Sequence, residues 1–325
     1  MTKIFYEADA SLEALRDRQV AVVGYGNQGR SWALNLRDSG IAVQVCVRSD
    51  ASAEQAREEG FDTTEITAAN DADVICVLVP DDVIPTIGLT PRPDACTIVA
   101  SGYTPAFERF TPAGDLGMVA PRMLGPEVRE CYIEGNGFIT AIGVEHDETG
   151  HALERVLAVA LAIGGLREGA IELTLEQEAI LDLGVEQVLS PALAAVNEAF
   201  VGTMTDRGIP IEAIITELVL SGEVERTYRL LRERGFAVQS EYHSPTSQYG
   251  QLSRRGQYDH LDVRATMERL TDDISSGRFA DEWDAERDEG YPVLSELKQR
   301  HAGPMVRDYE TELRRRLGPG VTAGH

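Results

Sequence analysis

The sequence predicts an α/β domain with a doubly wound parallel sheet, followed by an all-helical domain. In the first half, short apolar runs typical of buried strands alternate with helix-like segments, which favours a parallel sheet with helices on its faces. After about residue 173 the strand patterns vanish and apolar residues recur at helical spacing. Because 325 residues are many for one hydrophobic core, we expect two domains, over residues 1–172 and 173–325.

The elements of the first half follow from these patterns in order. A short helix is expected at Ala8–Arg18, before a strand at Val20–Val23 whose continuous apolar run indicates burial on both faces. An amphipathic helix is expected at Glu148–Ile163, where a glycine pair follows. Between and after these segments we expect helices at Gly29–Ser39 and Ser52–Glu59, and strands at Ile41–Val47, Val74–Val79, Thr97–Ala100, Leu116–Ala120, Phe138–Val144 and Gly169–Thr174.

In the second half only helices are expected. Helical spacing covers Leu175–Asn197, Ile211–Gly235, Val263–Ser276 and Glu296–Leu317. The stretch His243–Gly250 is interpreted as a polar loop, a type of segment that often binds ligands. The glycine-rich tail, Gly318–His325, is expected to fray.

Composition limits the possible partners and location. A net charge of −24 argues against nucleic acid as a partner, because its phosphates would be repelled. The N-terminal residues lack the apolar core of a signal peptide, and no run reaches the roughly 18 apolar residues of a membrane span. The four cysteines are widely spaced without a C-x-x-C motif, which favours buried thiols in a reducing compartment. We therefore expect a cytoplasmic protein with no nucleic-acid or membrane partner.

A glycine motif lies between the first strand and the first long helix. Gly24, Gly26 and Gly29 form G-x-G-x-x-G, with Tyr25, Asn27 and Gln28 in the variable positions. The first glycine permits a tight turn, the second lets a pyrophosphate approach the backbone, and the third lets the helix pack close to the strand. Free N–H groups at the helix start then hold the phosphate charge. With a second strand following about twenty residues later, the pattern predicts a Rossmann domain that binds a nicotinamide dinucleotide.

The residues after the second strand bear on which dinucleotide is bound. An acidic residue there would accept the ribose hydroxyls of NAD. Arg48, Ser49 and Ser52 instead suit the 2′-phosphate of NADPH through charge-assisted hydrogen bonds, whereas Asp50 would repel that phosphate. We favour NADPH, and NADH stays open.

Two carboxylates in the helical half have the spacing of a metal site. Asp182 and Glu186 are four residues apart, so they share a helix face, and apolar residues flank both. Two like charges on an apolar face are unfavourable unless a cation lies between them, and carboxylates of this kind suit Mg²⁺. The alternative is a solvated face of an acidic helix, which spacing alone does not exclude.

Several stretches together resemble one family. The motif Val22–Gly29, the segment Ala33–Gly40, Leu78–Val83 and Val119–Pro121 resemble the short, class I form of ketol-acid reductoisomerase. So do Asp182–Gln187, Ser244–Gly250 and Ile274–Trp283, so that the resemblance spans nearly the full chain.

The resemblance implies an activity and a set of site residues. The family binds NADPH and two Mg²⁺ ions, rearranges an acetohydroxy acid by alkyl migration and reduces the resulting 2-keto acid, as a step of branched-chain amino-acid synthesis. It implies that Asp182 and Glu186 are metal ligands, that Ser244 holds the substrate carboxylate, and that Pro80 and Asp81 lie beside the nicotinamide. It also implies a homodimer at least, because the second pair of metal carboxylates comes from a partner subunit.

Three positions depart from the family pattern. Of the second carboxylate pair, Glu223 matches one member, but Val219 stands at the other position, with Glu217 two residues away as a possible substitute. Ser101 stands where the family has histidine, and Arg122 stands where it has lysine. Serine cannot act as an imidazole base, and arginine keeps its proton where a buried lysine can lose it.

These departures leave three hypotheses. The first is a ketol-acid reductoisomerase with a divergent site, in which Asp182, Glu186, Glu223, Ser244, Arg122 and Ser101 carry the chemistry. The second is a relative that reduces a 2-keto or 2-hydroxy acid without the migration. The third is a non-catalytic dinucleotide-binding protein.

Overall fold

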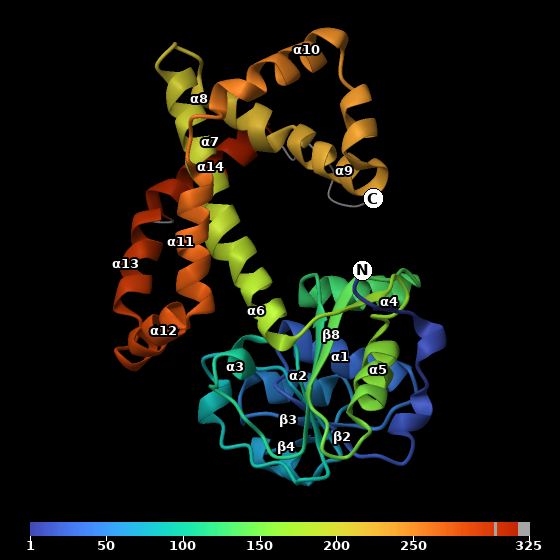
Figure 1. The fold of residues 1–325 in the computed structure, drawn as a ribbon. Helices are drawn as coiled ribbons and strands as arrows, with labels where there is room; N and C mark the ends of the chain where they lie inside the picture. The colour runs from blue at the N-terminus through green and yellow to red at the C-terminus, as the bar shows by residue number, and fades with distance from the viewer. Residues whose placement is uncertain (302–303, 318–325) are drawn as a thin grey trace. The chain divides into compact units, whose positions relative to one another are not determined.

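The computed structural model describes residues 1–301 and 304–317, so the expected fraying of the tail lies outside the described residues. The chain divides into two compact units, the first over Met1–Leu183 and the second from Gly184 onward (Figure 1). The first unit contains the sheet, and the described part of the second is helical.

The first unit is built on one nine-stranded sheet with the order β1-β9-β8-β7-β6-β5-β2-β3-β4. The order reverses at β2, since the chain first adds strands on one side of it and then crosses to the other. The strands are β1 (Ile4–Phe5), β2 (Val20–Val23), β3 (Val43–Cys46), β4 (Thr63–Thr64), β5 (Val74–Val77), β6 (Cys96–Val99), β7 (Asp115–Pro121), β8 (Thr140–His146) and β9 (Ala170–Glu172).

The sheet is mainly parallel, which confirms the predicted class. All six pairings from β4 to β7 and between β8 and β9 are parallel. Two pairings differ from the expectation of a fully parallel sheet, because β7 with β8 and β1 with β9 are antiparallel. A helix that we did not predict, α4 (Gly125–Glu134), joins β7 to β8.

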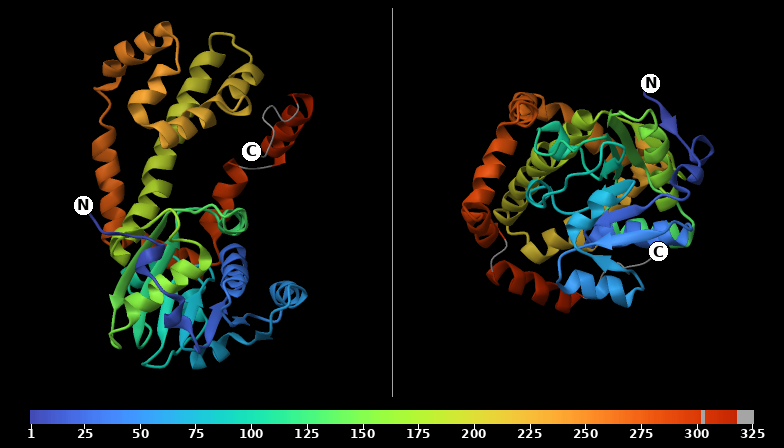
Figure 2. Two further views of the ribbon diagram at one scale, coloured as in Figure 1. Left: turned by 90° about the vertical axis from the view of Figure 1, so that its right-hand side faces the viewer. Right: turned by 90° about the horizontal axis from the view of Figure 1, so that it is seen from below.

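Alternate residues of the central strands enter two separate cores. In β2, Val20 and Val22 pack with one cluster, whereas Ala21 and Val23 pack with the other, as the two-residue period of a strand requires. Helices α1 (Asn27–Asp38), α2 (Ala51–Glu58), α4 and α5 (Ala152–Ile163) contribute to the first cluster. The two views in Figure 2 show these strands running side by side with helices next to them.

The expected helix at Ala8–Arg18 is wrong. The chain instead forms two short 3₁₀ turns, Glu7–Asp9 and Leu12–Leu15. The Ser11 hydroxyl accepts the Glu13 N–H at 3.2 Å and starts the second turn, and Asp17 then adopts a left-handed φ of 57° that stops it. The other expected strands and helices of this half are present with ends shifted by a few residues.

The described part of the second unit consists of helices, which confirms the prediction for this half. Helix α6 (Leu175–Gly184) leads into it. The other helices are α7 (Ser190–Thr205), α8 (Ile211–Ile215), α9 (Glu223–Glu241), α10 (Pro245–Arg254), α11 (Val263–Ser275), α12 (Arg278–Asp288), α13 (Pro292–His301) and α14 (Pro304–Leu317).

Two details of the helical half differ from the sequence prediction. The expected polar loop at His243–Gly250 is mostly helix α10, which Ser244 caps through a hydrogen bond from the Ser247 N–H (3.3 Å) and which begins with proline. Two rare π-helical segments, Val185–Leu189 and Thr216–Leu220, interrupt the predicted helices. Gly222, with a φ of 72°, then separates the second segment from α9.

The continuous helical stretch from α6 through α7 is apolar and little covered. By length and composition Leu175–Thr205 would suffice to cross a membrane, yet only 17% of its most apolar window is buried. The stretch is not an unbroken apolar run, because charged residues such as Asp182 and Glu186 interrupt it. Helix α7 has no buried residue, and its Leu193, Val196 and Phe200 side chains are all exposed.

Candidate functional site

The three glycines of the motif form the turn between β2 and α1. Gly24 has a φ of 97°, and a Cβ there would lie 2.6 Å from the Leu78 carbonyl oxygen. A Cβ on Gly29 would overlap the Gly24 carbonyl oxygen, so the helix packs directly on the turn. Gly26, by contrast, has nothing within 4 Å of the same position. The protein therefore does not need a glycine at 26 for its own packing, which leaves room there for a ligand to approach the backbone.

This turn lies at the reversal in strand order, where doubly wound sheets bind ligands. A cavity of about 330 Å³ opens beside it, lined by residues 26–28 of the turn and by the ends of β5 and β6 with the residues that follow them. The predicted residues that line this cavity are Gly26, Asn27, Gln28, Pro80, Asp81 and Ser101.

Two further cavities extend along the same edge toward β3. One of about 220 Å³ is lined by Gly24, Tyr25, Arg48, Asp50 and Ser52, among others. The other, about 320 Å³, is lined by Arg48 and Ser49 with Arg57 and residues of β4. The sequence-predicted cofactor residues are thus brought together along one edge of the sheet. A dinucleotide, which is long and has a charged middle, fits such a row of cavities centred on a helix N-terminus.

The acid in the β3–α2 loop has a structural role. The Asp50 carboxylate caps α2 by accepting the Ser52 N–H at 2.9 Å, and it lies 3.7 Å from the Arg48 guanidinium. Arg48 is otherwise largely exposed, with 78% of its side chain accessible. Asp50 therefore neutralises part of the positive charge that a 2′-phosphate would meet, and it occupies one donor at the start of α2.

A hydrogen-bonded network supports the turn from behind. The buried Tyr25 hydroxyl donates to Glu59 at 2.6 Å, and the Arg30 guanidinium donates to the same carboxylate at 2.5 Å. The hydrogen bond from Arg30 holds the pKa of Glu59 below its usual value, and burial raises the pKa of Tyr25. The network ties the end of α2 to the start of α1.

Gln28 joins the turn to the segment that follows β7. Its amide nitrogen donates to the Met123 carbonyl oxygen at 3.2 Å, and its amide oxygen accepts from the Trp32 indole at 3.1 Å. A Cβ on Gly125, at the start of α4, would overlap the backbone of Asn27. The residues around Arg122 are therefore packed on the predicted cofactor turn.

Arg122 bridges two carboxylates of α6. Its Nη1 donates to Glu178 Oε1 at 2.5 Å and its Nη2 to Asp182 Oδ1 at 2.8 Å. Glu178 is buried and also accepts the Gly102 N–H at 2.7 Å, whereas 40% of the Asp182 side chain is accessible. Burial raises the pKa of Glu178, against the lowering effect of the Gly102 amide and of Arg122. Two positions flagged from the sequence, Arg122 and Asp182, are thus in direct contact.

Our reading of the sequence missed Glu178. Its signal was its position one helical turn before Asp182, on the same face. The backbone at Gly102 packs closely against α6 beside Glu178, because a Cβ on Gly102 would overlap the Leu175 carbonyl oxygen. Ser101, next to it, accepts the Tyr103 N–H at 3.2 Å. Its hydroxyl thus shapes the local turn while lining the cavity beside the glycine motif.

The remaining predicted residues belong to the second unit. Glu186 lies in the first π-helical segment, and Val219 and Glu217 lie in the second. Glu223 is the first residue of α9, and its N–H donates to the Ser221 hydroxyl at 3.3 Å. Ser244 caps α10. π-Helical segments occur frequently at functional sites, and both of these carry candidate metal positions.

Carboxylates such as Asp182 are the kind of ligand that Mg²⁺ prefers, although few of them lie close together within the described residues. Among residues 1–301 and 304–317, no three His, Cys, Asp or Glu side chains surround one point. Mg²⁺ often takes only one or two protein carboxylates and completes its shell with waters and substrate oxygens. The partly exposed Asp182 carboxylate meets that requirement, with Arg122 as its present partner.

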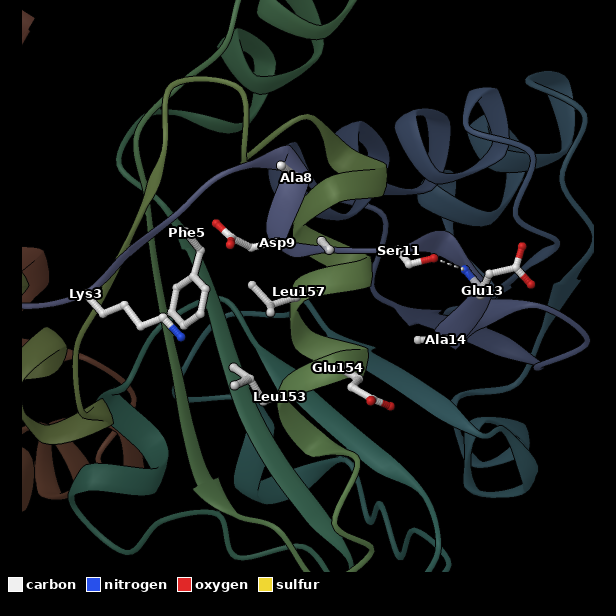
Figure 3. Close-up of a pocket in the computed structure, with 11 residues that line it drawn as sticks. Lys3, Phe5, Ala8, Asp9, Ser11, Glu13, Ala14, Leu153, Glu154 and Leu157 are labelled. Atoms are coloured by element: carbon white, nitrogen blue, oxygen red, sulfur yellow. Dashed lines mark hydrogen bonds between the residues drawn. The ribbon is translucent and has the colours of Figure 1, made fainter.

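A larger cavity lies elsewhere in the first unit. It has a volume of about 720 Å³ and lies between the N-terminal 3₁₀ turns and α5 (Figure 3). Its acidic side chains already have partners, because Asp9 accepts the Tyr6 N–H, Glu13 pairs with Arg16 and Glu154 lies 3.1 Å from His151. Cavity size alone therefore does not identify the cofactor site.

Family comparisons agree with the order of the two halves. Residues 14–169 match the family model described as acetohydroxy acid isomeroreductase, NADPH-binding domain. Residues 175–318 match the model of the ketol-acid reductoisomerase C-terminal domain.

Individual relatives match over almost the whole chain. The chain is 36% identical to a ketol-acid reductoisomerase (NADP(+)) of Caldivirga maquilingensis, over 98% of this chain and 100% of the relative. It is 33% identical to a ketol-acid reductoisomerase (NAD(P)(+)) of Metallosphaera sedula, over 100% and 98%. Among solved structures, an NADH-preferring ketol-acid reductoisomerase from an uncultured archaeon superimposes with a TM-score of 0.88 at 31% identity, covering 96% of this chain and 98% of the other. The chain belongs to the ketol-acid reductoisomerase family of NAD(P)H-dependent oxidoreductases and carries that family's NADPH-binding domain.

Proposed function

We propose that this chain is an active, Mg²⁺-dependent ketol-acid reductoisomerase that converts an acetohydroxy acid of the 2-acetolactate type into a 2,3-dihydroxy acid. The observation that carries the proposal is the juxtaposition of the dinucleotide edge with the α6 carboxylates through the Arg122 segment. Gln28 of the glycine turn bonds to Met123, and the neighbouring Arg122 bonds to Asp182. All of these contacts lie within the first unit.

Most of the predicted catalytic residues have a specific role in this proposal. Asp182 and Glu186, with Glu223 from a partner chain, hold Mg²⁺, which when bound polarises the hydroxyl and carbonyl oxygens of the substrate. Ser244 orients the substrate carboxylate. The turn at Gly24–Gly29, with Pro80 and Asp81, would hold the nicotinamide, which when bound would supply the hydride for the carbonyl carbon. Arg122 stays protonated throughout, so it stabilises negative charge and transfers no proton.

For the cofactor we propose NADPH as the preferred form, with NADH also accepted. Arg48, Ser49 and Ser52 line the cavities next to β3 and supply the donors for a 2′-phosphate. The contact between Asp50 and Arg48 weakens that preference, because it neutralises part of the arginine charge. We therefore expect this pocket to bind NADPH only modestly more tightly than NADH.

We propose a homodimer whose second copy covers the exposed face of α7. Helix α7 is apolar, none of its residues is buried by the residues that the structure describes, and its Val196 side chain is 64% exposed. A lipid bilayer is a poorer cover, since Glu186 and Glu198 lie on the same stretch and charge inside a membrane is costly. The buried free thiols of Cys46, Cys76 and Cys96 support a reducing, cytoplasmic location.

A pair of substrates tests the activity. We expect the purified protein with Mg²⁺ and NADPH to consume NADPH with 2-acetolactate and to release the dihydroxy acid. Turnover only of the 2-keto intermediate, added in place of 2-acetolactate, would indicate the reductase without migration. Turnover of neither substrate, with NADPH still bound in calorimetry, would indicate the non-catalytic alternative.

A further inference from the structure

The guanidinium of Arg122 is held between two carboxylates that differ in their freedom. Glu178 is buried, and each of its oxygens has a partner, Oε1 in Arg122 and Oε2 in the Gly102 N–H. Asp182 is far more accessible, and the contact that joins it to Arg122 uses one oxygen, Oδ1. Glu178 therefore fixes the arginine, and Asp182 is the partner that can exchange it for another cation.

A permanent positive charge at this place has a direct consequence for metal binding. The guanidinium stays protonated at any pH at which the protein folds, and its planar fork can contact two acceptors at once. A divalent cation bound to Asp182 would lie within a few ångströms of Nη2 and be repelled by it. The cation and the arginine thus compete for the same carboxylate.

We propose that Arg122 is an internal counter-ion that occupies Asp182 in the metal-free protein and that Mg²⁺ has to displace. This inference rests on the proposed function, in which Asp182 is a metal ligand. On metal binding the guanidinium withdraws from Asp182 and remains on Glu178, which has no other charged partner among its described contacts. Arg122 consequently weakens Mg²⁺ binding and keeps the Asp182 side chain ordered until the metal arrives.

Calorimetric titration of the full-length protein with MgCl₂, without nucleotide or substrate, tests this. We expect Arg122→Gln to tighten the Mg²⁺ Kd by about tenfold, the scale on which groups around metal ligands act. Arg122→Lys keeps the charge but loses the two-carboxylate fork, so we expect a smaller tightening. If Arg122→Lys binds Mg²⁺ with the wild-type Kd while Arg122→Gln binds it more tightly, direct competition for Asp182 is overturned. The positive charge would then act on the metal only through its electrostatic field.

Two controls separate the possible failures. Arg129→Gln removes an arginine that bridges Asn35 and Asp38 at 2.8 and 2.6 Å in the same unit, and it should leave the Mg²⁺ Kd unchanged.

Asp182→Asn should weaken Mg²⁺ binding in every background. If it does, and the Arg122 variants still bind no tighter than wild type, the counter-ion proposal is wrong while the metal site stands. If Asp182→Asn binds as wild type does, the metal assignment itself fails. An unchanged NADPH Kd for each variant shows that the variant is folded. If Arg122→Gln does not fold, the Mg²⁺ Kd of Arg122→Lys alone decides the test.

Discussion

The two units of the molecule bury their apolar side chains to very different extents. In the first unit, three neighbouring strands, β2, β5 and β6, are buried along their whole length, and helices such as α5 bury most of their residues. In the second, α7, α10 and α13 bury none, although α7 is rich in apolar side chains. The first unit therefore completes its own core, while the second exposes an apolar face on α7, which we propose a second copy covers.

The units also differ in how they fix functional positions. In the first, parallel strands and a glycine turn leave little freedom, since a Cβ on Gly24 or Gly29 would meet backbone atoms. In the second, Glu186 and Val219 lie in π-helical segments, and Gly222, with a left-handed φ, separates the second of these segments from helix α9, which begins at Glu223. The nucleotide edge is thus fixed by packing within its own unit, and under our proposal the carboxylates of the helical half are completed by a partner chain.

The largest effect is expected where the first unit is most tightly packed. Gly29→Ala would force its methyl group into the Gly24 carbonyl, a strain on the order of 1–3 kcal/mol, and would deform the phosphate turn. We expect a lower melting temperature together with loss of NADPH binding, measured by differential scanning fluorimetry and calorimetry.

Gly26→Ala is the matched control for that change. Nothing lies within 4 Å of the added methyl group, so the melting temperature without nucleotide should match wild type. NADPH affinity should still fall by about tenfold or more, equal to about 1.4 kcal/mol, because the methyl group stands where the pyrophosphate approaches. Undiminished NADPH binding by Gly26→Ala would show that the pyrophosphate does not pass over this residue.

A smaller effect is expected in the second unit, where one contact among many is changed. Val196→Glu places a charge in the exposed apolar face of α7, and we expect the dimer to dissociate at micromolar concentration in analytical ultracentrifugation. Ile133→Glu on α4 alters a residue of nearly equal exposure, 66% against 64%, and should leave the dimer intact.

The same experiment distinguishes the occupants of the α7 face. A wild-type protein that sediments as a monomer, and a Val196→Glu variant indistinguishable from it, would contradict a second copy as the cover. Sedimentation of wild type with lipid vesicles, abolished by Val196→Glu, would assign the face to a membrane instead.

The sequence predicted the sheet well for a physical reason. Strands such as Val20–Val23 are buried on both faces, so their apolar runs carry a strong local signal, and the observed bounds of this strand are the predicted ones. Helix α4 was missed although it has local start and stop signals, Pro126 in its first turn and Gly135 with a left-handed φ of 77° at its end; it packs on α1. The helix α10 was missed because its polar composition outweighed the Ser-Pro start signal.

The site was predicted less evenly. The glycine motif and the loop after β3 could be placed because each is one continuous segment with a defined chemical demand. The contact of Arg122 with Glu178 and Asp182 spans about 60 residues and depends on tertiary packing, so the sequence indicated only that an arginine had replaced a lysine. The π-helical segments also have no simple sequence signal, although they carry Glu186 and Val219.

The most direct test of the account is a comparison of turnover and cofactor affinity in Asp182→Asn. With 2-acetolactate, NADPH and Mg²⁺, we expect turnover to fall by about two orders of magnitude or more, the loss typical when a group that stabilises developing charge is removed. The NADPH Kd should stay at the wild-type value, and Glu176→Gln, an exposed acid on the same helix, should behave as wild type in both measurements. Wild-type turnover by Asp182→Asn would contradict the account, because the α6 carboxylate would then hold no catalytic metal.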